Sequence, residues 1–246
     1  FNGAAYAQVY NTNTLSGTIN MTGTSNGIQL RDGNAVLTVN GGGKIHGYGQ
    51  VFQTFGGTTL ANNGTISADT AAQTLALNPS NILGSGVFEA KNGGVLSIGG
   101  LFNGSNAVVH VDANPASAVL VNGGGLTGSF AASTGSGISF AGNAANLIAT
   151  ATIAADLTFS GNAYAQVYNA NTVSGTIHRN GMAATSWNRR MANAAWPVGV
   201  GRKLRSLIVA TAIAVDDSAS AAPTSSAAFA SMPNSMVPPA SAMPQM

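Results

Sequence analysis

The sequence predicts an all-β protein whose body is a β-solenoid, that is, a parallel β-helix. Three observations lead to this prediction: charged residues are rare while glycine is abundant, short apolar segments alternate with turn residues, and the sequence repeats itself. A Greek-key β-sandwich is the competing fold. We favour the solenoid because the glycine corners are dense and the two sides of each strand differ little in charge.

The composition excludes several classes of protein. Only 7% of the 246 residues are charged and 45% are hydrophobic, with 32 glycines and no cysteine. Ample apolar residues argue against a disordered chain, and the glycines argue against a helical bundle. A sequence without cysteine cannot form a disulfide scaffold, a thiolate zinc site or a cysteine nucleophile.

The charges divide the chain into two parts. Residues 1–178 carry three basic and five acidic side chains, whereas residues 179–246 carry six basic and two acidic ones. The sequence pI of about 9.2 therefore comes from the second part. The first part has no basic stripe of the kind that nucleic-acid binding needs, so we expect no nucleic-acid partner.

Short strands follow one another through residues 1–178. Those that are richest in aliphatic side chains span 35–39, 74–77, 94–98, 107–111 and 118–121. Clusters such as Asn-Gly-Gly-Gly separate them, because Asn and Gly adopt a positive φ at little cost. A solenoid with about 20 residues per turn would give this part roughly nine turns.

An internal repeat is the strongest signal. Residues 1–19 and 159–177 are identical at fifteen of nineteen positions. A shorter echo relates residues 35–43 to residues 118–125. Short strands and glycine corners that are reused in this way are typical of a solenoid.

Two motifs point to a family. The run VNGGGKI at 39–45 and the run LANNGTISA at 60–68 resemble the repeats of bacterial autotransporter and haemagglutinin-type adhesin passengers. The resemblance covers about residues 1–178 and implies a right-handed parallel β-helix in a secreted or outer-membrane-anchored protein at the cell surface. The secretion signal and the C-terminal outer-membrane barrel of that family are not recognisable here. Because Phe1 lies inside a repeat, we expect the chain to be part of a longer protein.

The repeat pattern stops after Ile177. Residues 179–215 are basic and then apolar, and we expect a short helix or a cap on the end of the solenoid. Residues 216–246 are rich in Ser, Ala, Pro and Met, and we expect them to be disordered. A shifted reading frame from residue 178 onward would produce the same break in pattern, and that alternative stays open.

No motif of a known catalytic or cofactor site is complete in this sequence. The P-loop, the dinucleotide fingerprint, the Gly-x-Ser-x-Gly elbow and the calcium-binding nonapeptide are not matched. His46, His110 and His178 have no partner at the spacing of metal ligands. We interpret them as surface or turn histidines and expect neither a metal nor a cofactor.

Three acids suggest an enzymatic alternative. Asp69, Glu89 and Asp112 follow one another at intervals close to the expected length of a turn. Stacked on one face, they could supply the pair of carboxylates that a polysaccharide hydrolase or lyase needs. The favoured interpretation is that each is a turn acid or a solvated strand end, so we predict no catalytic residue.

The pentapeptide Tyr-Ala-Gln-Val-Tyr occurs twice. In a strand, alternation places Tyr6 and Tyr10 on one face, and likewise Tyr164 and Tyr168. Such pairs could form an exposed platform for sugars. We favour packing between turns or at a junction between modules.

These features favour a structural or adhesive role without enzymatic activity. The chain would be a stiff repeat scaffold for cell-surface attachment, in contact with glycans or proteins of a host or neighbouring cell. Self-association through the solenoid ends would fit the same architecture. The alternative is a β-helix carbohydrate-active enzyme that uses the stacked acids.

Overall fold

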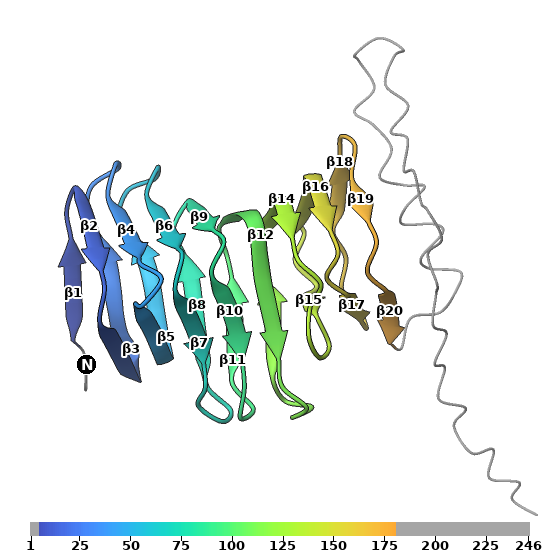
Figure 1. Ribbon diagram of the computed structural model, residues 1–246, viewed down its shortest axis with the longest axis horizontal. Helices are drawn as coiled ribbons and strands as arrows, with labels where there is room; N and C mark the ends of the chain where they lie inside the picture. The colour runs from blue at the N-terminus through green and yellow to red at the C-terminus, as the bar shows by residue number, and fades with distance from the viewer. Residues whose placement is uncertain (1–4, 181–246) are drawn as a thin grey trace, which may run out of the picture.

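The computed structural model describes residues 5–180 and confirms the predicted all-β fold, a parallel β-solenoid of about eight turns. Every strand pairing in this range is parallel. Figure 1 shows the strands side by side along the long axis, from β1 in blue to β20 in orange. The five strands predicted from aliphatic segments are all present.

The strands are, in chain order, β1 (Tyr6–Val9), β2 (Thr12–Leu15), β3 (Thr18–Leu30), β4 (Val36–Val39), β5 (Lys44–Gln53), β6 (Thr59–Asn62), β7 (Thr65–Ala68), β8 (Thr74–Asn78), β9 (Asn81–Gly84), β10 (Val87–Ala90), β11 (Val95–Ile98), β12 (Leu101–Val111), β13 (Ala118–Val121), β14 (Gly125–Phe130), β15 (Ile138–Phe140), β16 (Leu147–Ile153), β17 (Leu157–Ser160), β18 (Gln166–Tyr168), β19 (Thr172–Val173) and β20 (Ile177–Asn180).

The solenoid has three faces, each with one strand segment per turn. The β1 face contains β1, the C-terminal halves of β3 and β5, and then β8, β11, β13, β15, β17 and β20. The β2 face contains β2, β4, β6, β9, the N-terminal parts of β12, β14 and β16, and β18. The β7 face contains β7, β10, β19 and the remaining parts of the five long strands, which turn a corner without a break.

The turns differ in length. On the β1 face, residues that are register partners on successive turns form a column that begins at Tyr6 and ends at His178. Eight successive pairings, one for each turn, join these two residues. The longest step in this column leads from β5 to β8, and the shortest steps lie on either side of β15. The sequence-based expectation of roughly nine turns, which assumed about 20 residues per turn, is too high because several corners take up extra residues.

Apolar side chains fill the interior in columns that run along the axis. On the β1 face, the inward column consists of Ile28, Val51, Leu77, Ile98, Val121, Phe140 and Phe159, all buried. Strand alternation directs every second residue inward, which gives the repeated intermediate-and-buried pattern of β4, β10, β11 and β13. The rings of Phe140 and Phe159 stack at 4.7 Å with their planes 2° apart. Burial of these columns supplies the main favourable free energy of folding.

Buried asparagines satisfy backbone groups at the corners. Asn146 is fully buried, and its side-chain amide donates to the carbonyls of Ala141 (2.7 Å) and Tyr164 (3.2 Å). Its side-chain oxygen accepts a hydrogen bond from the amide of Gly123 at 2.7 Å. Since buried backbone groups without a partner are costly, one asparagine here stabilises the corners of three successive turns.

A glycine is required where one turn crosses closely over the next. Gly84 has a φ of 127°, in the left-handed region that favours glycine. A Cβ atom at this position would collide with the backbone carbonyl of Asn62. The abundance of glycine in the sequence therefore reflects the tight stacking of corners.

The expectations for residues 179–215 and 216–246 concern segments that, from residue 181 onward, lie outside the described residues. Arg179 and Asn180 are described, and they belong to β20.

We predict that Asn146→Leu lowers the free energy of unfolding by roughly 1 to 3 kcal/mol, because it leaves three backbone groups without a partner. Asn103→Ala, at an exposed position on β12, serves as the control and is expected to change stability by less than about 0.5 kcal/mol. Urea unfolding followed by circular dichroism measures both variants. Equal stabilities would show that the side chain of Asn146 does not hold the corners.

Candidate functional site

The three faces differ in charge. The strands of the β2 face contain no Asp, Glu, Lys or Arg within the described range, and those of the β1 face contain only Arg179. Most of the other charged side chains of residues 5–180 gather on or next to the β7 face, and two histidines lie among them. We call this group the titratable strip: Lys44, His46, Asp69, Glu89, Lys91, His110 and Asp112.

The register of the β7 face brings the residues of the titratable strip, apart from Lys44 in the column of Thr65 and Val87, together in two rows. The first row is a column of register partners, His46, Ser67, Glu89 and His110, which ends at Thr134. The second row lies just beyond the strand ends and contains Asp69, Lys91 and Asp112. Each is the first residue after the last one of β7, β10 or β12, and those last residues are register partners of one another. Successive turns are about 4.8 Å apart, so neighbours within a row are within reach of one another.

Most polar groups of the titratable strip already have partners. His46 Nδ1 lies 3.1 Å from Asp69 Oδ2, and Lys91 Nζ donates to Glu89 Oε1 at 2.8 Å. The ring of His110 is hydrogen-bonded to the Thr134 hydroxyl on the next turn. The strip is therefore a ladder in which the His46–Asp69 and His110–Thr134 contacts join successive turns, while the Lys91–Glu89 ion pair lies within one turn.

The surroundings of Glu89 favour its charged form. Burial raises the pKa of the Glu89 carboxyl, but the hydrogen bond from Lys91 and the neighbouring Ser67 hydroxyl oppose it. The positive charges of Lys91 and Lys44 act in the same direction, and the pKa of Glu89 is lowered overall. Glu89 is thus a carboxylate at neutral pH.

Lys91 and Asp112 are likewise held in their charged forms. The hydrogen bond to Glu89 is the largest influence on Lys91 and raises its pKa, with support from nearby negative charges. A hydrogen bond from Ser117 and the backbone amide of Asn92 (2.7 Å) lower the pKa of the Asp112 carboxyl. None of these three groups has the shift that general acid or base catalysis at neutral pH would require.

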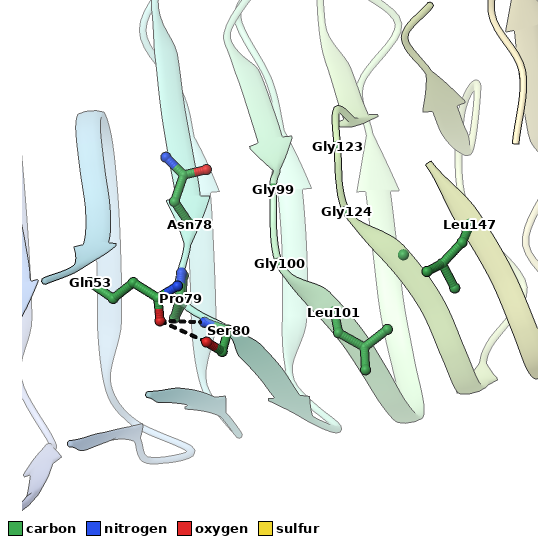
Figure 2. Close-up of a pocket in the computed structure, with 11 residues that line it drawn as sticks. Gln53, Asn78, Pro79, Ser80, Gly99, Gly100, Leu101, Gly123, Gly124 and Leu147 are labelled. Carbon is green, nitrogen blue, oxygen red and sulfur yellow. Dashed lines mark hydrogen bonds between the residues drawn. The ribbon is translucent and has the colours of Figure 1, made fainter. Parts of the chain in front are cut away.

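A depression of about 290 Å³ lies elsewhere, where the β1 face turns into the β2 face. Figure 2 shows its lining, in which glycines of successive corners alternate with uncharged side chains, and Ser80 donates two hydrogen bonds to Gln53 at 3.0 and 2.8 Å. Its lining residues are Gln53, Asn78, Pro79, Ser80, Gly99, Gly100, Leu101, Gly123, Gly124, Gly125 and Leu147. No titratable group lines it, so it cannot supply acid–base chemistry by itself.

The tyrosines of the repeated pentapeptide lie near the two ends of the described solenoid. Tyr6, Tyr10 and Tyr168 are 46, 48 and 52% exposed. The ring of Tyr6 also packs edge-on against Phe52, with centroids 5.5 Å apart. Tyr6 thus combines a packing contact with open surface, and Tyr10 and Tyr168 are exposed; a platform for sugars stays a prediction.

The structure brings the three predicted acids to one strip but gives them different roles. Asp69 and Asp112 occupy equivalent positions two turns apart, while Glu89 stands in the other row on the turn between them.

The pairing of histidines with the next turn was missed, although the spacings were informative. His46 and Asp69 are 23 residues apart, and His110 and Thr134 are 24 apart, each close to one turn.

Within residues 5–180, no group of three or more His, Cys, Asp and Glu side chains is arranged to hold a metal ion. The same residues contain no helix with the length and hydropathy needed to cross a lipid bilayer.

Comparison with known proteins gave no match: no family model, no curated protein and no solved structure is significantly similar to this chain.

We predict that Glu89→Gln destabilises the protein by roughly 0.5 to 1 kcal/mol at pH 7, since it removes a partly exposed ion pair. The pKa of Glu89 is lowered by folding, so its contribution is present above the unfolded pKa and is lost as the pH falls through the folded pKa. The difference from the wild type, measured by urea unfolding, should thus vanish in acid. In a Lys91→Met background the same substitution should cost little at any pH, and a full cost there would contradict the pairing.

Proposed function

We propose that this chain is a structural and adhesive segment of a secreted or surface-anchored bacterial protein, a stiff scaffold for cell-surface attachment. The single observation that carries the proposal is the unbroken apolar interior: on the β1 face one column passes through successive turns without a polar side chain from Ile28 to Phe159. Such an interior resists bending and local opening, because every turn is hydrogen-bonded to both of its neighbours.

The titratable strip is the part of this scaffold best suited to a specific contact. The β2 face has no charged strand residue within the described range, whereas the strip presents both signs of charge within a few turns. Charged groups that are held in place by partners orient an approaching surface and discriminate between partners. We propose glycans or proteins of a host or neighbouring cell surface as the partners of the strip, and an extracellular, outer-membrane-associated location for the protein.

A carbohydrate-active enzyme is the second candidate, and the convergence of Asp69, Glu89 and Asp112 on one strip favours it. By the spacing of strands, the backbones of Asp69 and Asp112 are about 10 Å apart, near the range that inverting glycosidases use. Two findings oppose it. The pKa values of Glu89 and Asp112 are lowered, while a general acid needs a raised one. The depression that could hold a sugar is elsewhere and contains no acid.

We predict that beads coated with the full chain attach to bacterial or epithelial cells, and that Glu89→Gln with Lys91→Met reduces attachment at least threefold. Ser97→Ala with Thr158→Ala, both on the outside of the β1 face, is the matched control and should attach like the wild type. Attachment is counted under flow at physiological salt. If neither the wild-type nor the control beads attach, the adhesive role is wrong. Equal attachment by the wild type and both double variants would show that the titratable strip is not the contact surface.

We also predict that the full chain releases no reducing ends and no unsaturated products from a panel of neutral and acidic polysaccharides. Turnover that Glu89→Gln or Asp112→Asn abolishes, without loss of fold by circular dichroism, would establish the enzymatic alternative instead.

A further inference from the structure

Within the described residues, the two copies of the long repeat share the structure of their asparagine corner, at opposite ends of the solenoid. The equivalent corner residues Asn11 and Asn169 both have a positive φ, 54° and 61°. Two residues after each, an asparagine donates its side-chain amide to the carbonyl of the tyrosine before the corner, at 2.6 and 2.8 Å. The sequence identity therefore reproduces a conformation.

The two copies nevertheless lie on different faces. Gln8 and Val9 belong to the β1 face, while their counterparts Gln166 and Val167 belong to the β2 face. The rest of the repeat moves in the same way, to the face that comes next along the chain. β2 lies on the β2 face and its counterpart β19 on the β7 face, while the start of β3 lies on the β7 face and its counterpart β20 on the β1 face. The shorter echo also changes face, because β4 lies on the β2 face and β13 on the β1 face.

The length of the repeat explains the change of face. Seven successive pairings lead from Tyr6 to Thr158, and they correspond to seven whole turns. Tyr164, the counterpart of Tyr6, lies past Thr158 and across the next corner, just before β18 of the β2 face. The repeat is therefore seven turns long plus one face, or about one third of a turn.

Each part of the repeated segment fits two different faces because its requirements are local. Leu15 and Ile19 pack against the core at one end, and their counterparts Val173 and Ile177 do the same at the other. Each copy needs one inward aliphatic residue per face and an asparagine corner between faces, and every face of the interior offers aliphatic partners.

The second copy shows what the C-terminal edge of the preceding turns can bind. Residues 166–168 pair with β16, residues 172–173 pair with the end of β16, and residues 177–180 pair with β17. This edge, formed by β16 and the start of β17, is thus occupied by the opening segment of the repeat and by the three residues that follow it.

We propose that residues 1–158 are one unit of an array, and that the edge formed by β16 and by Leu157 and Thr158 at the start of β17 is an acceptor for the opening segment of another copy of the unit. Each added copy is turned by one face, a third of a turn, about the solenoid axis. The proposal depends on geometry alone. If the proposed adhesive function also holds, successive titratable strips point in three directions, about 35 Å apart along the axis by the strand spacing. Such a rod would bind multivalently to surfaces on any side.

The test is an extended chain in which a second copy of residues 1–158 is inserted before residue 159 of the full protein. Since the chain contains no cysteine, spin labels attach only to cysteines that are introduced. Ser97 lies on the outside of the β1 face and Val87 on the outside of the β7 face, and both are partly exposed. Ser97→Cys and Val87→Cys in the parent chain first establish that the labels leave stability unchanged.

Two label pairs in the extended chain are compared by electron paramagnetic resonance. The first joins position 97 of the first unit to position 97 of the inserted unit, and the second joins position 97 of the first unit to position 87 of the inserted unit. Their axial separations are both about 34 Å by the strand spacing. With a turn of one face, the second pair shares a face and gives the shorter distance; with units stacked in phase, the first pair is shorter.

A second pair shorter by about 3 to 6 Å, estimated from an approximately three-sided cross-section with faces about 10 Å apart, would support the proposal. The reverse order would overturn the rotation. Loss of the β-sheet signal of the parent, two separate unfolding transitions, or distance distributions too broad to rank would overturn the acceptor edge itself. None of these outcomes depends on cell attachment, so failure of this inference and failure of the proposed function are distinguishable.

Discussion

The spacing of about 4.8 Å between neighbouring parallel strands is the constraint on which this structure depends. Every turn has to present three strand segments at this distance from the turn before it, and the backbone can do so only if the corners also stack. The buried Asn146 and the glycine at position 84 follow from the stacking of corners. Asn146 supplies hydrogen-bond partners that backbone groups at the corner would otherwise lack, and Gly84 leaves room for the neighbouring backbone. The apolar columns are the other consequence, since inward residues of equivalent position must share one interior.

The same constraint determines where charge is tolerated. A charged residue on one turn lies about 4.8 Å from its equivalent on the next, so rows of like charge would repel one another. On the β7 face, charges of opposite sign alternate, with Lys91 between Asp69 and Asp112, and Lys91 is also the partner of Glu89. The strands of the other two faces carry almost no charge within the described range. Charge is therefore concentrated on one face in an arrangement where neighbours of opposite sign alternate.

The sequence was sufficient to predict the class of fold. It was insufficient to predict the phase of the solenoid, that is, the face and the turn on which each residue lies. Strand segments, glycine corners and the repeat all act locally, so the solenoid and its main strands followed from them. The number of turns did not, because the step from Gly49 to Leu75 is much longer than the steps on either side of β15. Such differences arise in corners, whose length the residue types alone do not specify.

The unknown phase also limited the prediction of the site. Intervals close to one turn suggested a single stack of Asp69, Glu89 and Asp112, whereas Glu89 lies in a different row from the other two. The shift leaves Glu89 beside Lys91 and Ser67, where it is a structural carboxylate with a lowered pKa. A small error in the predicted position of Glu89 is thus enough to turn a residue of an ion-pair ladder into a candidate catalytic acid.

The position of the repeated segment also depends on the lengths of the corners. A segment that needs only an inward aliphatic residue and an asparagine corner carries no information about which face it will occupy. Its face is determined by the total length of the turns that precede it, and therefore by the corners. The interval between the two copies, one face more than a whole number of turns, follows from the sum of these corner lengths. In such a solenoid the strands determine how well each turn packs, while the corners determine the direction in which a surface feature points.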